Sequence, residues 1–140
     1  MAATTGYVYD PRFLEHDTGA GHPERPARLT RIVESLASNA WFADLPRFEP
    51  LPADRASVEA IHAPEYVDHA DQVIASGAEY LDSMDVAVSR SSFEIALLAA
   101  GAGMTLANEI IAGRVNNGMA IIRPPGHHAE AQRALGFCIF

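Results

Sequence analysis

The sequence predicts an α/β fold with three layers, α/β/α, built around a parallel sheet. Segments typical of strands and helices alternate along the chain, which is the rhythm of this fold class. Residues 119–122 are wholly apolar, as expected of a central strand that is buried on both faces of a parallel sheet. Residues 91–112 form a long apolar helical segment that stops at Gly113. With 140 residues, the chain has room for a single core.

The first third of the chain predicts a strand, a polar loop and a helix. Residues 6–9 are a short β-rich run closed by an Asp-Pro pair. The loop leads to Pro26, which suits the first turn of a helix. Residues 41–45 predict a helical turn, and residues 48–51 a short strand. The apolar residues after Pro26 recur at i, i+3, i+4 and i+7, on one helical face; they are Leu29, Ile32, Val33 and Leu36.

Two helices are expected in the middle of the chain. Asp54 can cap a short helix over residues 54–61. Pro64 begins a second helix, and residues 77–90 have the character of a loop. The side chains that should face inward from the second helix are Val67, Ala70 and Ile74.

The last third of the chain holds the longest helix and two predicted strands. Ser91 and Glu94 are three residues apart, the spacing of a capping box. Because the helix over residues 91–112 is apolar nearly all round, we expect it to be buried. The strand at residues 119–122 follows, and residues 136–140 begin another apolar strand.

Composition limits the partners and the location that we expect. The formal net charge of -8 argues against a nucleic-acid-binding protein, which would carry a basic face. Cys138 is the single cysteine, so no intrachain disulfide can form and a reducing, cytoplasmic location is expected. The N-terminal residues lack the basic region and apolar run of a signal peptide. The longest apolar stretch, residues 95–107, is too short and too rich in glycine for a membrane span. We expect neither nucleic acid nor membrane as a partner, and the oligomeric state stays open.

The tandem histidines His127 and His128 are the first candidates for chemistry. They follow Pro124-Pro125-Gly126, a stiff and sharply turned segment, at the carboxyl end of the strand at residues 119–122. In open parallel sheets, ligands bind outside the carboxyl ends of strands. Imidazoles titrate near neutral pH and therefore suit general acid–base catalysis. The alternative left open by the residues alone is a polar loop with two solvent-exposed histidines.

The histidines do not have the spacing of a metal site. Zinc ligands are usually separated by several residues, so that their side chains converge on one ion. His127 and His128 are adjacent, and the other four histidines show no ligand spacing with each other. We therefore predict no metal ligands in this sequence.

Several motifs, in order along the chain, give a specific resemblance. Residues 123–130, Arg-Pro-Pro-Gly-His-His-Ala-Glu, followed by Gly-Phe-Cys at 136–138, are similar to the signature of the histone deacetylase family. The similarity is to its class II and bacterial deacetylase-like amidohydrolase branch, with the acetylpolyamine amidohydrolases. Residues 21–26 resemble the family's first-loop motif, and residues 62–67 and 96–101 resemble its scaffold segments. The resemblance implies that residues 1–140 are the N-terminal part of a single domain with an arginase/deacetylase-like fold.

The resemblance also implies an activity, the zinc-dependent hydrolysis of acetyl-amine bonds in acetyl-lysine or acetylpolyamine substrates. His128 matches the family's general base and acid. His127 matches its partner, which has an electrostatic role. Phe137, with Gly136 beside it, matches an aromatic wall of the narrow channel that grips the acyl-lysine stem.

Two charged residues match more distant parts of the family's site. Asp85 matches a carboxylate at the rim that anchors the substrate backbone, and Arg25 matches an arginine in a cavity beneath the site, where acetate leaves. The residues alone favour an ordinary loop acid for Asp85 and a core residue for Phe137, while Arg25 reads as a surface charge or a partner of Glu24. Cys138 has no basic neighbour, so we expect a packed small residue and not a nucleophile.

The sequence departs from the family in what it lacks. In the family, two aspartates and a histidine, including an Asp-x-His pair, hold zinc, and a late tyrosine completes the site. No Asp-x-His pair is found in these 140 residues. We therefore expect the chain to carry the tandem-histidine half of a site and to be inactive alone. The alternative, from another functional class, is a non-catalytic fragment or remnant that lacks metal and associates with a partner.

Overall fold

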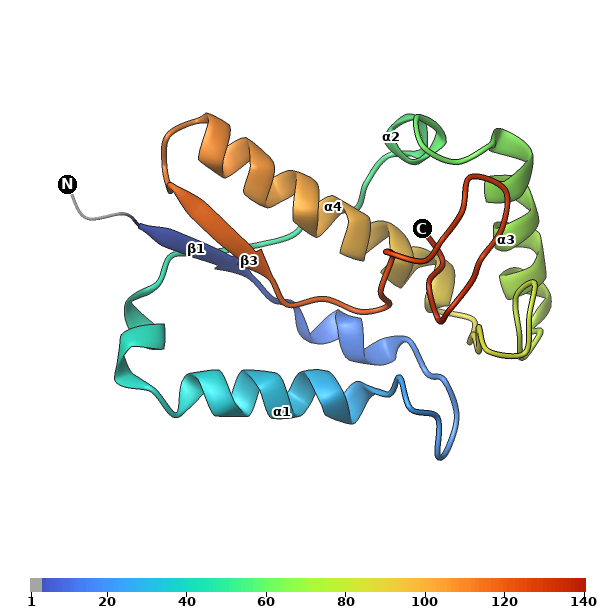
Figure 1. Cartoon of the computed structure of the whole chain (residues 1–140), viewed down its shortest axis with the longest axis horizontal. Coiled ribbons are helices and arrows are strands. Elements are labelled where there is room, and N and C mark those ends of the chain that lie inside the picture. The colour runs from blue at the N-terminus through green and yellow to red at the C-terminus, as the bar shows by residue number, and fades with distance from the viewer. Residues whose placement is uncertain (1–3) are drawn as a thin grey trace.

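A computed structural model describes residues 4–140 and shows a small parallel sheet between helices (Figure 1). Its strands are β1 (Thr5–Val8), β2 (Arg47–Phe48) and β3 (Asn117–Ala120), in the order β2-β1-β3. Both pairings are parallel, and Tyr7 lies opposite Arg47 on one side and Met119 on the other. Residues 1–3, on which the expectation of no signal peptide partly rests, lie outside the described residues.

Helices cover both faces of this sheet, as Figure 1 shows with α4 on one side and α1 on the other. This arrangement confirms the predicted α/β class. The expected helix starts are also confirmed, with proline in the first turn of α1 and α3, and the Asp54 carboxylate accepts the Ser57 N–H at 2.7 Å. The helices are α1 (Pro26–Ala37), α2 (Arg55–Glu59), α3 (Pro64–Ser76) and α4 (Ser92–Ile111), with 3-10 helices η1 (Pro11–Glu15) and η2 (Ala40–Asp44).

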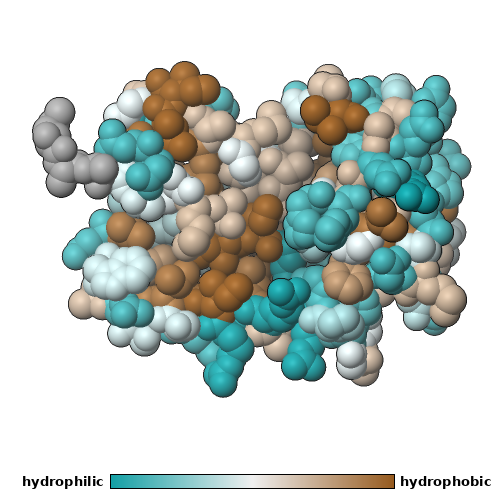
Figure 2. Space-filling model, viewed as in Figure 1, coloured by the Kyte–Doolittle hydropathy of each residue, from teal (hydrophilic) through white to brown (hydrophobic). Residues whose placement is uncertain are grey.

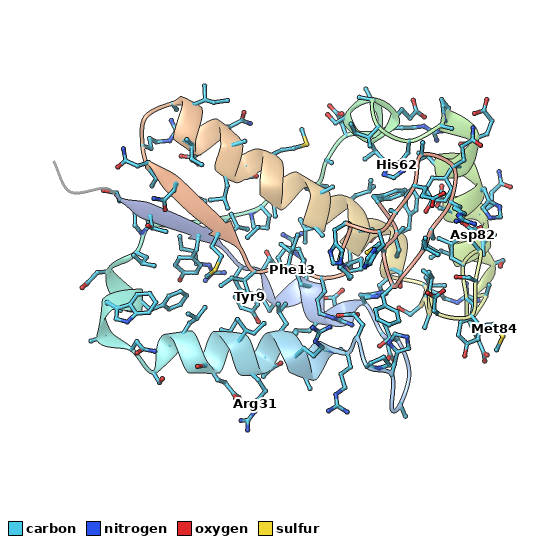
Figure 3. All side chains as sticks on the ribbon, viewed as in Figure 1. Tyr9, Phe13, Arg31, His62, Asp82 and Met84 are labelled. Carbon is cyan, nitrogen blue, oxygen red and sulfur yellow. The ribbon has the colours of Figure 1, made fainter. Side chains whose placement is uncertain are left out.

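The main core lies between α4, the sheet and α1. Val8 of β1 and Phe13 of η1 are fully buried at its centre, and the Phe13 side chain lies near the middle of the molecule (Figure 3). A second cluster joins α3 to the loop over residues 77–90 and to the end of the chain. The residues of this second cluster that matter for the site are Leu81, Ala134 and Ile139. The same packing that builds the core therefore also fixes the loops at the sheet's carboxyl end.

Strand β3 differs from its prediction in position and in burial. The pattern predicted a buried central strand at residues 119–122, whereas Asn117–Ala120 pair with β1 and the first three of these residues are exposed. Within residues 4–140 the central strand is β1, and β3 lies at an edge. The apolar run is real, but only Ile121, just beyond the strand, is fully buried.

Exposed apolar side chains lie on β3, at its open edge, and on α1. Met119 of β3 is 43 % exposed and Ile32 of α1 is 47 % exposed, and Figure 2 shows an extended apolar area over this part of the surface. Ile32 belongs to the apolar face predicted for this helix, yet in α1 only Leu29 is buried. The helical face predicted for α1 is thus only partly covered by residues 4–140.

Residues 136–140 do not form the predicted strand. Leu135 and Cys138 exchange backbone hydrogen bonds across a tight turn, in which Gly136 and Phe137 have φ angles of 58° and 72°. Positive φ values are incompatible with extended backbone. The apolar composition of this segment reflects packing of its side chains, not strand formation.

Helix α4 is buried on one face rather than all round, contrary to prediction. Met104 and Ile111 are 42 % and 83 % exposed, while the opposite face packs on β1, β3 and η1. By length and composition alone, α4 is the one helix within residues 4–140 that could cross a membrane. The capping box is also absent, because Ser91 makes no capping bond. Instead the Ser92 hydroxyl accepts the Ser89 N–H at 2.8 Å.

Two glycines of α4 allow a matched test of this packing. A Cβ at Gly101 would overlap the Leu51 carbonyl oxygen and come within 2.5 Å of Ala53 N, whereas a Cβ at Gly103 would meet nothing within 4 Å. We predict that Gly101→Ala lowers the free energy of unfolding by about 1–3 kcal/mol through overpacking. Gly103→Ala should raise it by roughly 0.5–1 kcal/mol, because alanine favours helix. Urea unfolding of both variants checks this, and equal effects would contradict the packing.

Candidate active site

A cavity of about 380 Å³ opens at the carboxyl end of the sheet. Its walls come from the loop before α1, from α1 itself and from two segments that follow β3. The cavity contains four of the six residues singled out from the sequence, namely His127, His128, Gly136 and Phe137. The other lining residues are Glu24, Arg28, Leu29, Ile32, Ile122, Arg123 and Pro125.

The tandem histidines lie side by side in this cavity. Their ring centroids are 4.3 Å apart, with an angle of 58° between the ring planes. The backbone N–H of His128 donates to Cys138 Sγ at 3.4 Å, which ties the histidine loop to the turn after it. Both histidines are exposed. They are therefore positioned by backbone contacts and remain open to a substrate.

The turn of Gly136 and Phe137 forms the part of the wall that adjoins His128. A Cβ at position 136 would come within 2.9 Å of His128 Cδ2, so both the contact and the positive φ of 58° require glycine there. The His22 ring packs edge-on against Phe137, with centroids 5.0 Å apart. Phe137 is half-buried and lines the cavity, which argues against its being only a core residue.

Asp85 lies beside this turn and is not among the residues that line the cavity. Its carboxylate accepts the Gly136 N–H at 3.1 Å and the Ser83 hydroxyl. The Ser83 hydroxyl, more than the Gly136 N–H, holds the pKa of Asp85 below its usual range. Asp85 is therefore a carboxylate at neutral pH, and part of its hydrogen-bonding capacity is used to hold the turn.

A buried ion pair connects the loop before α1 to the histidine loop. Arg123 is 1 % exposed and Glu24 is 4 % exposed. Arg123 Nε and Nη2 each donate to a Glu24 carboxylate oxygen at 2.8 Å. Arg123 Nη1 donates to the carbonyl oxygens of Phe13 at 3.1 Å and His16 at 2.6 Å. The pattern of the sequence did not reveal this pair, because its members are 99 residues apart.

Arg28 and Arg123 line the cavity, and Arg25 does not. Arg25 is exposed as the N-cap residue of α1 and does not line the cavity, whereas Arg28, one turn further along, does. Arg25 is also not the partner of Glu24, which pairs with Arg123. Arg25 precedes the helix with an extended backbone, whereas Arg28 lies in the first turn of α1. The sequence motif therefore found the right segment, but the arginine that lines the cavity from it is Arg28.

The described residues do not themselves form a metal site. Within residues 4–140, no group of three His, Cys, Asp or Glu side chains is placed to hold a metal ion. That His127 and His128 are not ligands stays a prediction. Cys138 is fully buried, and burial raises the pKa of its thiol, so it is the packed residue that was expected.

Comparison with known proteins decides the family. A family model described as the histone deacetylase domain matches residues 22–140. The chain belongs to the histone deacetylase family. It is 38 % identical to histone deacetylase 15 of Arabidopsis thaliana over 98 % of this chain and 26 % of the relative. It is 35 % identical to the human polyamine deacetylase HDAC10 over 84 % of this chain and 18 % of the relative.

A solved structure supports the same assignment. The crystal structure of the HDA15 HD domain matches with a TM-score of 0.90 and 36 % identity, over 99 % of this chain and 40 % of that chain. This match confirms the arginase/deacetylase-like fold. The chain thus spans less than half of the matched structure and about a quarter or less of the two relatives.

The buried His16, next to the Arg123–Glu24 pair, makes the stability of the fold depend on pH. Its ring lies 2.7 Å from the Ser92 hydroxyl and 3.7 Å from the Glu24 carboxylate. Burial first, and then the charge of Arg123, lowers the pKa of His16 from 6.5 to about 4. The unfolded chain therefore takes up a proton at a higher pH than the folded chain does. Stability contributed above pH 6.5 is lost as the pH falls toward 4.

We predict that this single group removes about 3 kcal/mol of stability between pH 6.5 and 4. In His16→Gln, the amide can still bond Ser92 but cannot take up a proton. The loss of unfolding free energy between pH 6.5 and 4 should therefore be smaller in this variant, by the amount that His16 contributes. Urea unfolding across this pH range checks the prediction, with the exposed His127→Gln as the control. An unchanged pH dependence in His16→Gln would contradict it.

Proposed function

We propose that this chain provides the proton-transfer part of a zinc-dependent deacylase that hydrolyses acetyl-lysine or acetylpolyamine amide bonds. The observation that carries the proposal is the placement of His127 and His128 beside Phe137 in one cavity. Membership of a family whose relatives are named histone and polyamine deacetylases supports the same reaction class.

The tandem histidines are assigned to the two proton transfers of amide hydrolysis. Attacking water must lose a proton, and the leaving amine must gain one before the carbon–nitrogen bond breaks. We assign both transfers to His128, whose backbone is tied to Cys138 and whose ring is packed against Gly136. His127, with its ring centroid 4.3 Å away, is assigned to stabilising the charge that develops.

Substrate binding is assigned to the wall of the cavity. The ring of Phe137, which lines the cavity and is supported edge-on by His22, offers an apolar surface to the methylene stem of an acylated amine. Asp85, ionised and beside Gly136, can accept N–H groups of a peptide or of a polyamine at the rim. We assign the role expected of Arg25 to Arg28, because a guanidinium in the cavity suits an acetate product.

Zinc belongs to this proposal as a cofactor held from outside the described residues. Members of the family are metal-dependent, whereas no set of metal ligands is found within residues 4–140. We propose that the zinc-holding part of the domain packs on the open edge of β3 and the apolar surface beside it. The same lack of ligands is what the alternative, a non-catalytic module that associates with a partner, would show.

The test compares His128→Ala and His127→Ala in the longest product of the reading frame that contains this chain. His128→Ala should abolish turnover of an acetyl-lysine substrate, since each proton transfer is worth about 10²–10⁴-fold. His127→Ala should retain measurable activity. Zinc content, measured on the same samples, should be unchanged in both variants.

The outcomes separate the assignments. Loss of zinc in His128→Ala would make that residue a ligand, and near-normal turnover would remove its role in proton transfer. The 140-residue chain alone serves as a control and should show no activity. Turnover by that chain, inhibited by a hydroxamate, would contradict the proposal that the zinc is held from outside the described residues. Inactivity of the longest product, with zinc supplied, would favour the non-catalytic alternative.

A further inference from the structure

We propose that Asp82 is a positioning residue for the turn that carries Gly136 and Phe137. The inference rests on the proposed function in one respect, that this turn forms the wall of the substrate cavity. Nothing in the sequence motifs singled out Asp82, which lies in the loop over residues 77–90, three residues before Asp85.

The side chain of Asp82 connects three segments of the chain. Its Oδ1 lies 2.7 Å from Nε2 of His69 on α3, and its Oδ2 accepts the N–H of Ala134 at 2.8 Å. Only 17 % of the side chain is exposed. In Figure 3, Asp82 lies against α3, whereas the neighbouring Met84 projects outward into solvent. Both carboxylate oxygens are thus committed to holding the segment at residue 134 against α3.

Asp82 and Asp85 hold alternate amides of the same segment. Asp82 accepts the N–H of Ala134, and Asp85 accepts the N–H of Gly136. One residue, Leu135, lies between these two amides, so the two carboxylates hold the chain at neighbouring points just before the turn. Two carboxylates from one loop therefore fix both the position and the direction of the chain as it enters the turn.

The position of this turn also affects His128. Gly136 lies so close to His128 that a Cβ would come within 3.0 Å of three ring and Cβ atoms of that residue. A shift of the turn away from α3 would therefore change the surroundings of His128 and move Phe137 together. Asp85 bonds the segment only at Gly136, and Asp82 adds a second point of attachment at Ala134, nearer to α3.

Unusual backbone conformations occur at both Asp82 and the turn that it holds. Asp82 and Phe137 are the two non-glycine residues within residues 4–140 that have positive φ, at 58° and 72°. That region disfavours side chains other than those of asparagine and aspartate. Phe137 is therefore held there against that preference, as residues at functional sites often are, whereas Asp82 suits this conformation. Here the two lie on opposite sides of the same contact between loops.

Amide hydrogen exchange on the 140-residue chain, followed by NMR, tests the inference without using turnover. Asp82→Gly removes the carboxylate and suits the positive φ. It should speed exchange at Ala134 and Gly136 by roughly tenfold or more, the value of a charge-assisted hydrogen bond, and shift the ring resonances of His128. Asp82→Asn keeps one acceptor and should restore protection at Ala134. Asp71→Asn, which removes a charge from the exposed side of α3, is the matched control.

The result expected is a local one. Amides of α4 and β1 should exchange at the parental rate in every variant. A uniform loss of protection would mean that Asp82 stabilises the whole fold and does not position the turn. Unchanged exchange at Ala134 in Asp82→Gly, or rapid exchange there in the parent, overturns the inference. Should Asp82→Gly fail to fold, His69→Ala, which frees one carboxylate oxygen, must speed exchange at Ala134. Absence of deacylase activity would overturn the proposed function and leave these exchange rates untouched.

Discussion

Arg123 joins the parts of the chain that build the cavity. It lies at the carboxyl end of β3, where the backbone turns toward the tandem histidines, and its guanidinium is buried against Glu24 and the carbonyl oxygens of Phe13 and His16. A buried guanidinium is costly unless its donors are satisfied, and here four hydrogen bonds satisfy it. The η1 helix, the loop before α1 and the histidine loop must therefore come together for any one of them to be stable.

This constraint explains why the site can be both open and well defined. His127 and His128 are exposed, so side-chain packing does not hold them. Their position is set by the buried Arg123–Glu24 pair, which holds the start of the histidine loop, and by the turn at Gly136, which packs against His128. Rigid support beneath exposed reactive groups is the arrangement that precise positioning of a substrate requires.

The sequence predicted the fold class and most element starts, because these depend on local patterns. The tandem histidines were found from their place after a strand, whereas Gly136 and Phe137, which line the same cavity, were found only from the family resemblance. Proline at the start of α1 and the Asp54 cap act within one helical turn. The edge position of β3 and the turn at residues 135–138 depend on contacts distant in sequence, so the apolar pattern gave the wrong result for both. The pairing of Glu24 with Arg123 and of Asp82 with Ala134 was invisible for the same reason.

A double-mutant cycle on Glu24 and Arg123 tests the central role of the buried pair most directly. The free energies of unfolding of Glu24→Gln, Arg123→Gln and the double variant are compared with that of the parent chain in urea. Each single change should cost about 3–5 kcal/mol, because it leaves a buried charge unpaired. The coupling energy should be about 2–3 kcal/mol, whereas the exposed Arg31–Glu34 pair should give about 0–1 kcal/mol. A coupling between Glu24 and Arg123 as small as that of the exposed pair would contradict the account.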